Sequence, residues 1–174
     1  MPVSGILALR DGVCVPVREI QAEDAEALRR LVGRSSERSI ELRFFGPMKE
    51  LSEERARRFA EVDGADRFAL VALDPEDEGE IVAVVRYERE AGTDGAEYAA
   101  LVEDRFQGRS LGIGLTRHLI EAARERGIKR LHALVMRENR SMLSLLRSLE
   151  LPERQRWENG LEHVEIDLQP EAAA

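Results

Sequence analysis

Apolar and polar residues along the chain follow two periods, and the shorter one predicts strands. Short runs rich in Val, Ala, Phe and Tyr, bounded by turn-forming segments such as DPEDEGE and AGTDG, are typical of strands joined by tight connections. The strands expected on this basis cover residues 13–20, 67–73, 80–90, 96–103, 130–136, 154–159 and 161–168. The three between 67 and 103 are expected to form an antiparallel meander, and Asn159-Gly160 is a strong turn signal for a closing hairpin.

The longer period predicts helices over 23–34, 51–62, 112–126 and 139–149. In the last of these, apolar residues recur at the i, i+3, i+4 and i+7 positions of one face, namely Met142, Leu145, Leu146 and Leu149. Ser52 is expected to cap the second helix through its hydroxyl. A meander followed by a β-α-β-α segment indicates an α/β protein of the α+β kind, with a central mixed, mostly antiparallel sheet flanked by about four helices.

Length and composition are those of one globular domain. The chain has 174 residues, of which 43% are apolar and 34% charged, enough to close a single core. We therefore expect one domain over 1–174, with its core at about 13–168. No apolar run approaches the ~20 residues that span a bilayer, and the first residues lack a leader pattern, so a cytoplasmic protein with no membrane partner is expected. The single cysteine, Cys14, stands between valines and is expected to be buried in a strand.

The net charge of −8 is unevenly distributed. Residues 105–147 hold ten basic and three acidic side chains, a net of +7, so the rest of the chain carries −15. Such a segment favours a local anion site, although the same arginines can equally serve to solvate two helices. Nucleic acid is not an expected partner, because the whole chain is acidic and the basic segment lacks interleaved aromatics.

Three glycines stand in the segment QGRSLGIG, residues 107–114, immediately before an expected helix. Glycine lets the backbone approach a ligand closely, and the first N–H groups of a helix have no hydrogen-bond acceptor inside that helix. Such a segment is therefore suited to bind a phosphate. A Walker P-loop is excluded, because no lysine follows Gly114. A dinucleotide fingerprint lacks its third glycine, since that position is Arg117.

The segment from Arg109 to Gly114 matches the pattern Arg/Gln-x-x-Gly-x-Gly/Ala, and the strand before it and the helix after it agree with that pattern. On these residues the chain resembles the GNAT superfamily of acyl-CoA-dependent N-acyltransferases, over about 13–168. The segments LRFFGPMKELSEE, EVDGADRFALVAL and MRENRSML are similar to the GNAT domain of bacterial Pat-type protein lysine acetyltransferases. The resemblance implies a GNAT fold and transfer of an acetyl group from acetyl-CoA to a primary amine, with a protein lysine as the expected acceptor.

The resemblance also assigns residues to the donor. Backbone N–H groups of the loop would cradle the CoA pyrophosphate, Arg105 and Arg109 would add charge, and two glycines would keep Cβ atoms out of the phosphate path. The strand over 98–102 would splay from the strand over 130–136 and offer backbone groups to the pantetheine arm. Asn139 would contact the pantetheine or cap its helix. The implied acetyl-CoA residues are Leu101, Val102, Gln107, Gly108, Arg109, Ser110, Leu111, Gly112, Ile113, Gly114 and Asn139.

Glu97 stands where Pat-like enzymes have their glutamate, and the resemblance makes it the general base. A lysine ammonium, with a pKa of about 10.4, has no lone pair at neutral pH and needs such a base. Strand alternation puts Glu97 at the end of a largely apolar stripe, where desolvation would strengthen it as a base. The rival carboxylates Glu103 and Asp104 are expected to face solvent or cap the loop. N–H groups near Leu101 and Val102 would stabilise the oxyanion.

Two departures from the family pattern leave the acceptor side open. Leu146 stands where many GNAT enzymes have a tyrosine that protonates the leaving thiolate, and Glu150-Leu151 replaces the usual Gly-Phe after that helix. Since a simple thiol has a pKa of about 8.5, loss of that acid weakens an enzyme only modestly. A non-catalytic acyl-CoA-binding regulatory module and an acetyltransferase for a small-molecule amine stay as alternatives, and a homodimer is compatible with the sequence.

The remaining candidates carry little chemistry. His118, His132 and His163 have no metal-ligand spacing with each other or with the cysteine, so no metal site is expected. Trp157 and the pair Phe44-Phe45 are expected in the core or in a lid.

Overall fold

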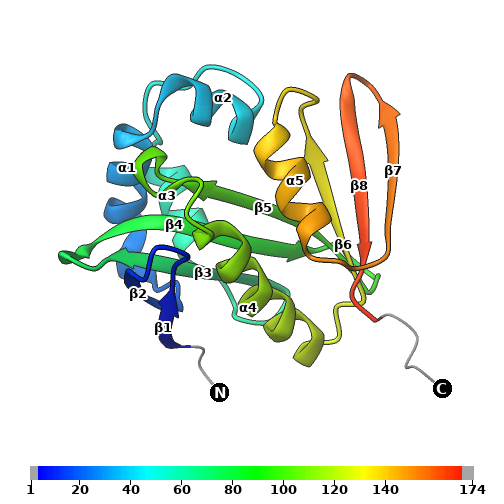
Figure 1. The fold of residues 1–174 in the computed structure, drawn as a ribbon, viewed down its shortest axis with the longest axis horizontal. Helices are drawn as coiled ribbons and strands as arrows, with labels where there is room; N and C mark the ends of the chain where they lie inside the picture. The colour runs from blue at the N-terminus through cyan, green and yellow to red at the C-terminus, as the bar shows by residue number, and fades with distance from the viewer. Residues whose placement is uncertain (1–3, 170–174) are drawn as a thin grey trace.

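One sheet lies between two layers of helices in the computed structural model, which describes residues 4–169 (Figure 1). Within these residues the sheet has eight strands in the order β1-β2-β3-β4-β5-β6-β8-β7. The strands are β1 (Ser4–Ala8), β2 (Cys14–Glu19), β3 (Arg67–Asp74), β4 (Asp77–Arg89), β5 (Gly95–Val102), β6 (Arg130–Val135), β7 (Glu153–Glu158) and β8 (Leu161–Asp167). All neighbouring strands are antiparallel except β5 and β6. The predicted mixed, mostly antiparallel sheet is confirmed.

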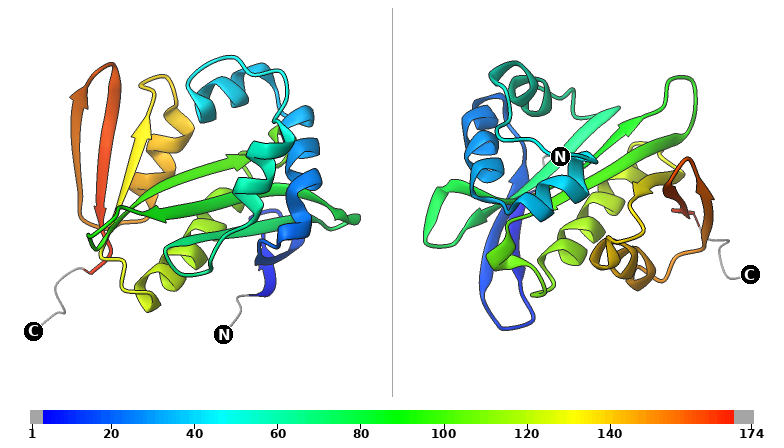
Figure 2. Two further views of the ribbon diagram at one scale, coloured as in Figure 1. Left: turned by 180° about the vertical axis from the view of Figure 1, so that it is seen from behind. Right: turned by 90° about the horizontal axis from the view of Figure 1, so that it is seen from above.

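Five α-helices flank the sheet within the same residues, where about four were predicted. They are α1 (Ala25–Arg34), α2 (Glu37–Phe44), α3 (Glu53–Ala60), α4 (Leu111–Glu125) and α5 (Arg140–Ser148), with two short 3-10 turns, η1 (Ala22–Asp24) and η2 (Asp104–Phe106). α4 and α5 lie on one face of the sheet, and α1 and α3 lie on the other (Figures 1 and 2). The predicted cap of α3 is confirmed, because the Ser52 hydroxyl accepts the N–H of Arg55 at 3.2 Å.

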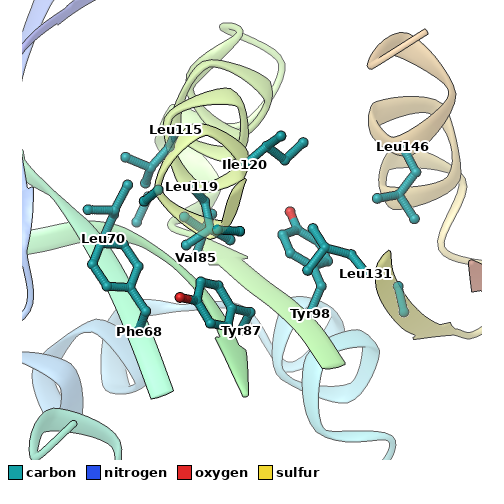
Figure 3. Close-up of a cluster of buried hydrophobic side chains, with 14 of the residues drawn as sticks. Phe68, Leu70, Val85, Tyr87, Tyr98, Leu115, Leu119, Ile120, Leu131 and Leu146 are labelled. Atoms are coloured by element: carbon teal, nitrogen blue, oxygen red, sulfur yellow. The ribbon is translucent and has the colours of Figure 1, made fainter. Parts of the chain in front are cut away.

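The two faces of the sheet bury two hydrophobic cores, and successive residues of one strand enter different cores. Leu70 of β3 packs under α4, whereas its neighbour Val71 packs under α1. Figure 3 shows the first core, where Leu115 and Leu119 of α4 point onto Phe68 and the strands below. Each fully buried leucine contributes about 1.5–3 kcal/mol of transfer free energy. Burial on both faces explains why β3 reads as an unbroken apolar run.

The two central strands β5 and β6 pair over a short stretch and then separate. Their parallel register covers only Gly95, Ala96 and Glu97, opposite residues 130–132. Beyond Glu97, β5 keeps its pairing with β4 as far as Val102 but has no strand on its other side. Figure 1 shows the two strands diverging from their lower right-hand ends. The predicted splay is therefore confirmed.

The sequence did not predict two of the elements, β1 and α2. β1 pairs with β2 at the sheet edge and is exposed except at the partly buried Leu7, so no alternation marks it clearly. α2 buries only Ile40, which is too little for a helical apolar stripe. Its local signals are the N-cap Ser36, which accepts the N–H of Ser39 at 3.1 Å, and Phe45 in the left-handed conformation at its end.

Two burial predictions are wrong. Cys14 is exposed, because it begins β2 opposite Ala8 while the alternate residues Val15 and Val17 face the core. Trp157 is 48% exposed on the edge strand β7, where its ring lies 3.8 Å from the guanidinium carbon of Arg137. An edge strand of charged residues leaves this indole outside the core.

Candidate active site

A cavity of about 430 Å³ opens where β5 and β6 separate. Its walls come from β5, the glycine loop (residues 107–114), β6, α2 and α5. The predicted site residues that line it are Glu97, Leu101, Val102, Gln107, Gly108, Ser110, Leu111, Gly112, Ile113 and Asn139. Arg109 and Gly114 are absent from this lining among the described residues. The fold thus gathers into one cavity almost the whole set that the sequence predicted.

The glycine loop presents a row of free backbone N–H groups to this cavity. Gly108 and Ser110 have φ angles of 72° and 71°, and these left-handed residues turn the chain so that the amides before α4 converge. Within residues 4–169, the N–H groups from Gly108 through Ile113 have no protein acceptor. Such groups need water or a ligand, and together with the helix N-terminus they favour an anion.

The spacing of Gly112 and Gly114 has a packing reason that the sequence did not reveal. A Cβ on Gly112 would lie 3.0 Å from Cδ1 of Leu145 on α5 and 3.5 Å from Val102 on β5. A Cβ on Gly114 would lie 2.9 Å from Leu7 of β1. The missing side chains let α4 sit close to α5, β5 and β1, and an additional role beside a phosphate stays a prediction.

The arginines of the loop are held by carboxylates. Arg109 donates to Asp11 at 2.6 Å, and this hydrogen bond lowers the pKa of Asp11. Arg105 bridges Glu103 and Asp74 at 2.6 Å each. Both side chains therefore brace the loop, and a direct contact of either with the donor stays a prediction.

Gln107 connects the glycine loop to α2. Its side-chain amide donates to the Ser39 hydroxyl at 3.0 Å and to the Val102 carbonyl at 2.9 Å. The loop side of the cavity and the opposite wall are thus joined by a single side chain.

Along the unpaired edge of β5, only every second residue directs its backbone N–H and C=O groups toward the cavity. Glu103, just after β5, donates its N–H to the carbonyl of Val82 on β4 at 2.8 Å, so Glu103 and Val82 form a hydrogen-bonded pair of the ladder. Since backbone groups of successive strand residues point to opposite edges, those of Leu101 also point to β4, whereas those of Ala100 and Val102 face the cavity. The N–H of Leu101 thus points to β4, the N–H groups of its neighbours Ala100 and Val102 point to the cavity, and the expected oxyanion contact near Leu101 and Val102 stays a prediction.

Glu97 lies at the point where β5 leaves β6 and lines the cavity. It is exposed, so the predicted desolvation of this carboxylate is wrong for the protein without a bound substrate. Its register partner on β4 is Glu88, and like charges directly opposite each other repel. Arg43 of α2 lies near enough that the two opposite charges attract. Glu97 is thus a carboxylate with access to solvent and to any amine in the cavity.

The two rival carboxylates are engaged in structure. Glu103 is only 5% exposed and pairs with Arg34 and Arg105, so the expectation that it faces solvent is wrong. Asp104 accepts the N–H and hydroxyl of Ser36 and the hydroxyl of Ser39, which ties η2 to the start of α2. Neither carboxylate lines the cavity.

On the α5 side, Asn139 lines the cavity and also caps the helix. Its side-chain oxygen accepts the N–H of Met142 at 3.1 Å. Leu146 is 2% exposed and points into the core (Figure 3). The buried Tyr98 hydroxyl is paired with Thr116 at 2.7 Å, and burial raises its pKa to about 12. No tyrosine among the described residues lines the cavity from α5.

Sequence reasoning missed the α2 wall of the cavity. Ser39, Leu42, Arg43 and Phe45 line it, and so does Arg10 from the loop between β1 and β2. The backbone N–H of Arg10 donates to the Ser110 hydroxyl at 2.9 Å. The capping serine before residue 37 was the available signal for this wall.

The basic side chains of residues 105–147 do not line the cavity. Of the arginines in 105–147, several are paired with carboxylates or carbonyls elsewhere, as Arg126 is with the Gly64 carbonyl and Arg130 with Asp94. Arg10 and Arg43, both outside the segment, supply the arginines of the lining. The predicted local anion site is therefore not built from these side chains. His132 and His163 face each other at 3.3 Å across β6 and β8, which their spacing did not predict.

The fold and the cavity together define an acetyltransferase. The family model described as Acetyltransferase (GNAT) family matches residues 35–150, and the chain belongs to this family. The sequence is 34% identical to acetyltransferase PA5475 of Pseudomonas aeruginosa over 140 residues, which are 79% of this chain and 75% of that protein.

Solved structures give the same assignment. The GNAT domain of S. lividans PAT is 35% identical with a TM-score of 0.87, covering 94% of this chain and 96% of that one. A cAMP-binding acyltransferase from Mycobacterium smegmatis is 26% identical with a TM-score of 0.69, covering 97% of this chain but 48% of that one. The predicted resemblance to GNAT enzymes and to the Pat domain is confirmed. No helix of residues 4–169 is long and apolar enough to cross a membrane.

The cavity fits the acyl donor of this family, acetyl-CoA. The free amides of the glycine loop suit its diphosphate, and the unpaired edge of β5 suits the amide-bearing arm between diphosphate and thioester. The volume of about 430 Å³ is in the range of small-molecule sites.

Proposed function

We propose that this chain transfers an acetyl group to a primary amine, that a protein lysine is the acceptor, and that Glu97 is the general base. The observation that carries the proposal is the arrangement of Glu97 in one cavity with the open edge of β5 and the free amides of the glycine loop. The likeness to the GNAT domain of S. lividans PAT supports the acceptor class.

Bound acetyl-CoA supplies a thioester carbonyl, the electrophile of the reaction. The amides from Gly108 through Ile113 hold the diphosphate end, and the β5 edge aligns the arm. Glu97 accepts a proton from the ammonium group of the acceptor, directly or through one water, which frees the nitrogen lone pair for attack. Holding amine and carbonyl in one cavity removes most of the entropy barrier to their encounter.

The N–H groups of Ala100 and Val102 face the cavity and are placed to stabilise the negative charge that develops on the carbonyl oxygen. As the carbon–sulfur bond breaks, the attacking nitrogen gives up its extra proton, and the CoA thiolate takes up that proton through water or leaves as the thiolate, since a simple thiol has a pKa of about 8.5. This accounts for a functional site without a tyrosine at position 146.

The test replaces Glu97 by glutamine. We expect Glu97→Gln to lower kcat by about 10²–10⁴-fold, because general-base catalysis contributes that much, with the Kd for acetyl-CoA unchanged. Glu88→Gln is the matched control, since Glu88 lies directly opposite on β4, is equally exposed and loses the same charge. Steady-state kinetics with a lysine peptide and calorimetry with acetyl-CoA measure the two effects. Equal rates for both variants would exclude Glu97 as the base.

The other candidates make different predictions in the same assays. A non-catalytic acyl-CoA-binding module would bind acetyl-CoA and transfer nothing to a broad panel of peptides and amines. An enzyme for small amines would favour free amines over lysine peptides by kcat/KM. Mass spectrometry of a proteome incubated with the protein and acetyl-CoA separates the protein substrate from both.

A further inference from the structure

Three arginines from three different elements gather around two phenylalanine rings beside the active-site cavity. Arg43 (α2) and Arg55 (α3) lie 4.6 and 5.0 Å from the ring centre of Phe44, and Arg86 (β4) lies 4.6 Å from that of Phe59. We call Arg43, Arg55 and Arg86 the arginine cluster. Stacking on aromatic faces fixes the planes of the guanidinium groups while leaving their N–H edges available.

No carboxylate among residues 4–169 forms a salt bridge with the arginine cluster, and Glu97 and Glu88 attract Arg43 and Arg86 only from a greater distance. None of its three side chains lies within 4.0 Å of a carboxylate oxygen, in contrast to Arg34, Arg105 and Arg109. Its hydrogen bonds are limited to Arg86 with the Phe59 carbonyl at 3.1 Å and Arg55 with the Met48 sulfur at 3.5 Å. Since each guanidinium has five N–H donors, most donors of the cluster are unused.

Burial and mutual repulsion make this arrangement electrostatically unfavourable without an anion. Burial, and then the charge of Arg55, lower the pKa of Arg43 to about 10. Burial, and then the charges of Arg43 and Arg67, lower the pKa of Arg86 to about 9. A bound anion would relieve both effects at once.

The cluster adjoins the reacting end of the cavity. Arg43 and Leu101 line the main cavity and also a small side cavity of about 20 Å³ whose other walls include Arg86 and both phenylalanines. Arg86 is in register with Ala99, two residues from Glu97 on the same face of the sheet. The side cavity has room for about one water-sized atom, such as one oxygen of a carboxylate held mainly in the larger cavity, and its remaining walls are aliphatic.

We propose that the arginine cluster binds a carboxylate of the acceptor, so that the acceptor is an amine with a carboxylate close to it. This deepens the proposed function and rests on the amine being delivered to Glu97. Glu97 attracts the ammonium end and repels the carboxylate, while the cluster attracts the carboxylate, so the two charges orient the acceptor in one direction. The carboxylate belongs either to a free amino acid or to an acidic residue beside a lysine.

Matched acceptors test the proposal and separate the two sources. One arm compares L-leucine with L-leucinamide, and the other compares a capped peptide in which aspartate follows lysine with its asparagine counterpart. Wild type should favour the carboxylate member of one pair by about ten- to a hundredfold in kcat/KM, as expected for hydrogen bonds to a charged group. The arm that shows the preference identifies the source.

Variants of the cluster should remove that preference, and Arg55→Gln, which lies outside the lining of the main cavity, should leave the rate with the carboxylate-free acceptor unchanged. Arg55→Gln changes an exposed residue and is not expected to disturb folding, and Arg43→Gln and Arg86→Gln remove the two partly buried members. Arg38→Gln is the control, because Arg38 is an exposed arginine on the same helix as Arg43 that pairs with Glu41. A preference that survives in all three cluster variants would overturn the proposal.

Failure of the carboxylate site is distinguishable from failure of the proposed function. Wild type that acetylates both members of each pair equally keeps the acetyltransferase proposal and refutes the carboxylate site. If no acceptor is acetylated, thermal unfolding with the two members of each pair still decides. A rise in Tm with only the carboxylate member of either pair, which Arg55→Gln loses, supports the site, and equal Tm values within both the leucine pair and the peptide pair in wild type refute it.

Discussion

The glycine loop and the arginine cluster border the same cavity but present positive charge in different ways. The loop uses partial charges on backbone N–H groups, fixed by the left-handed Gly108 and Ser110 and by the start of α4. The cluster uses full charges on side chains that come from α2, α3 and β4 and are kept in place by aromatic stacking. Backbone recognition depends on chain geometry, whereas side-chain recognition depends on which elements pack together.

The largest expected effect on the loop side comes from adding a side chain where α4 meets α5. Gly112→Val should weaken acetyl-CoA binding by about a hundredfold, because its Cβ would lie 3.0 Å from Leu145 and overpacking displaces the helix start. Gly33→Val is the control, since a Cβ at that helical glycine meets nothing within 4 Å. Calorimetric titration with acetyl-CoA measures both. Normal affinity in Gly112→Val would refute the placement of the donor on this loop.

A smaller effect is expected at the left-handed residue of the loop. Ser110→Val should lose about 1–3 kcal/mol of unfolding free energy, because a β-branched side chain is strained at a φ of 71° and the bond from the Arg10 N–H is lost. Ser110→Gly relieves the strain and should keep acetyl-CoA affinity within about twofold, since the loop amides stay in place. Chemical denaturation and titration compare the two variants. Similar losses of affinity in both would mean that the hydroxyl, and not the backbone geometry, recognises the donor.

The smallest effect concerns the link between the two regions. Asp104→Asn should lose about 1 kcal/mol, because Asp104 accepts bonds from Ser36 and Ser39 at the start of α2. Partial burial opposes ionisation, but these hydrogen bonds lower the pKa of Asp104 below its usual value. The stabilisation is therefore present above about pH 4 and is lost as the pH falls through the lowered pKa. Urea denaturation at a series of pH values should show a difference between wild type and variant that is full at pH 7 and shrinks as the pH falls below about 4.

The difference between the glycine loop and the arginine cluster also explains which features of the protein could be predicted from its sequence. The glycine loop was predictable because its residues are contiguous, so the spacing of Gly108, Gly112 and Gly114 and the helix after them lie in one short segment. The strands of the meander were predictable for the same reason, since alternation is local. The open edge between β5 and β6 followed from the family resemblance and is confirmed by their short pairing.

The α2 wall of the cavity and the arginine cluster could not be predicted from the sequence in the same way. Arg43, Arg55 and Arg86 are far apart in sequence and share no spacing, and only the packing of α2 and α3 on β4 brings them together. α2 itself buries one residue and has no periodic stripe. The basic segment suggested an anion site that its side chains do not form, because the charge pattern of a sequence does not show which carboxylate pairs with each arginine. Asp11, for example, pairs with Arg109 although the two residues are far apart in sequence.

The split between β5 and β6 also determines which unpaired strand edges of the sheet face outward. Unpaired strand edges recruit strands of other molecules and promote aggregation when they face outward. Here the outermost strands are β1 and β7, and β7 carries the charged residues Glu153, Arg154, Arg156 and Glu158, which discourage pairing with a second strand. The unpaired edges of β5 and β6 lie in the interior of the sheet, facing each other. The molecule thus keeps strand edges free for a small substrate without exposing them to another copy of itself.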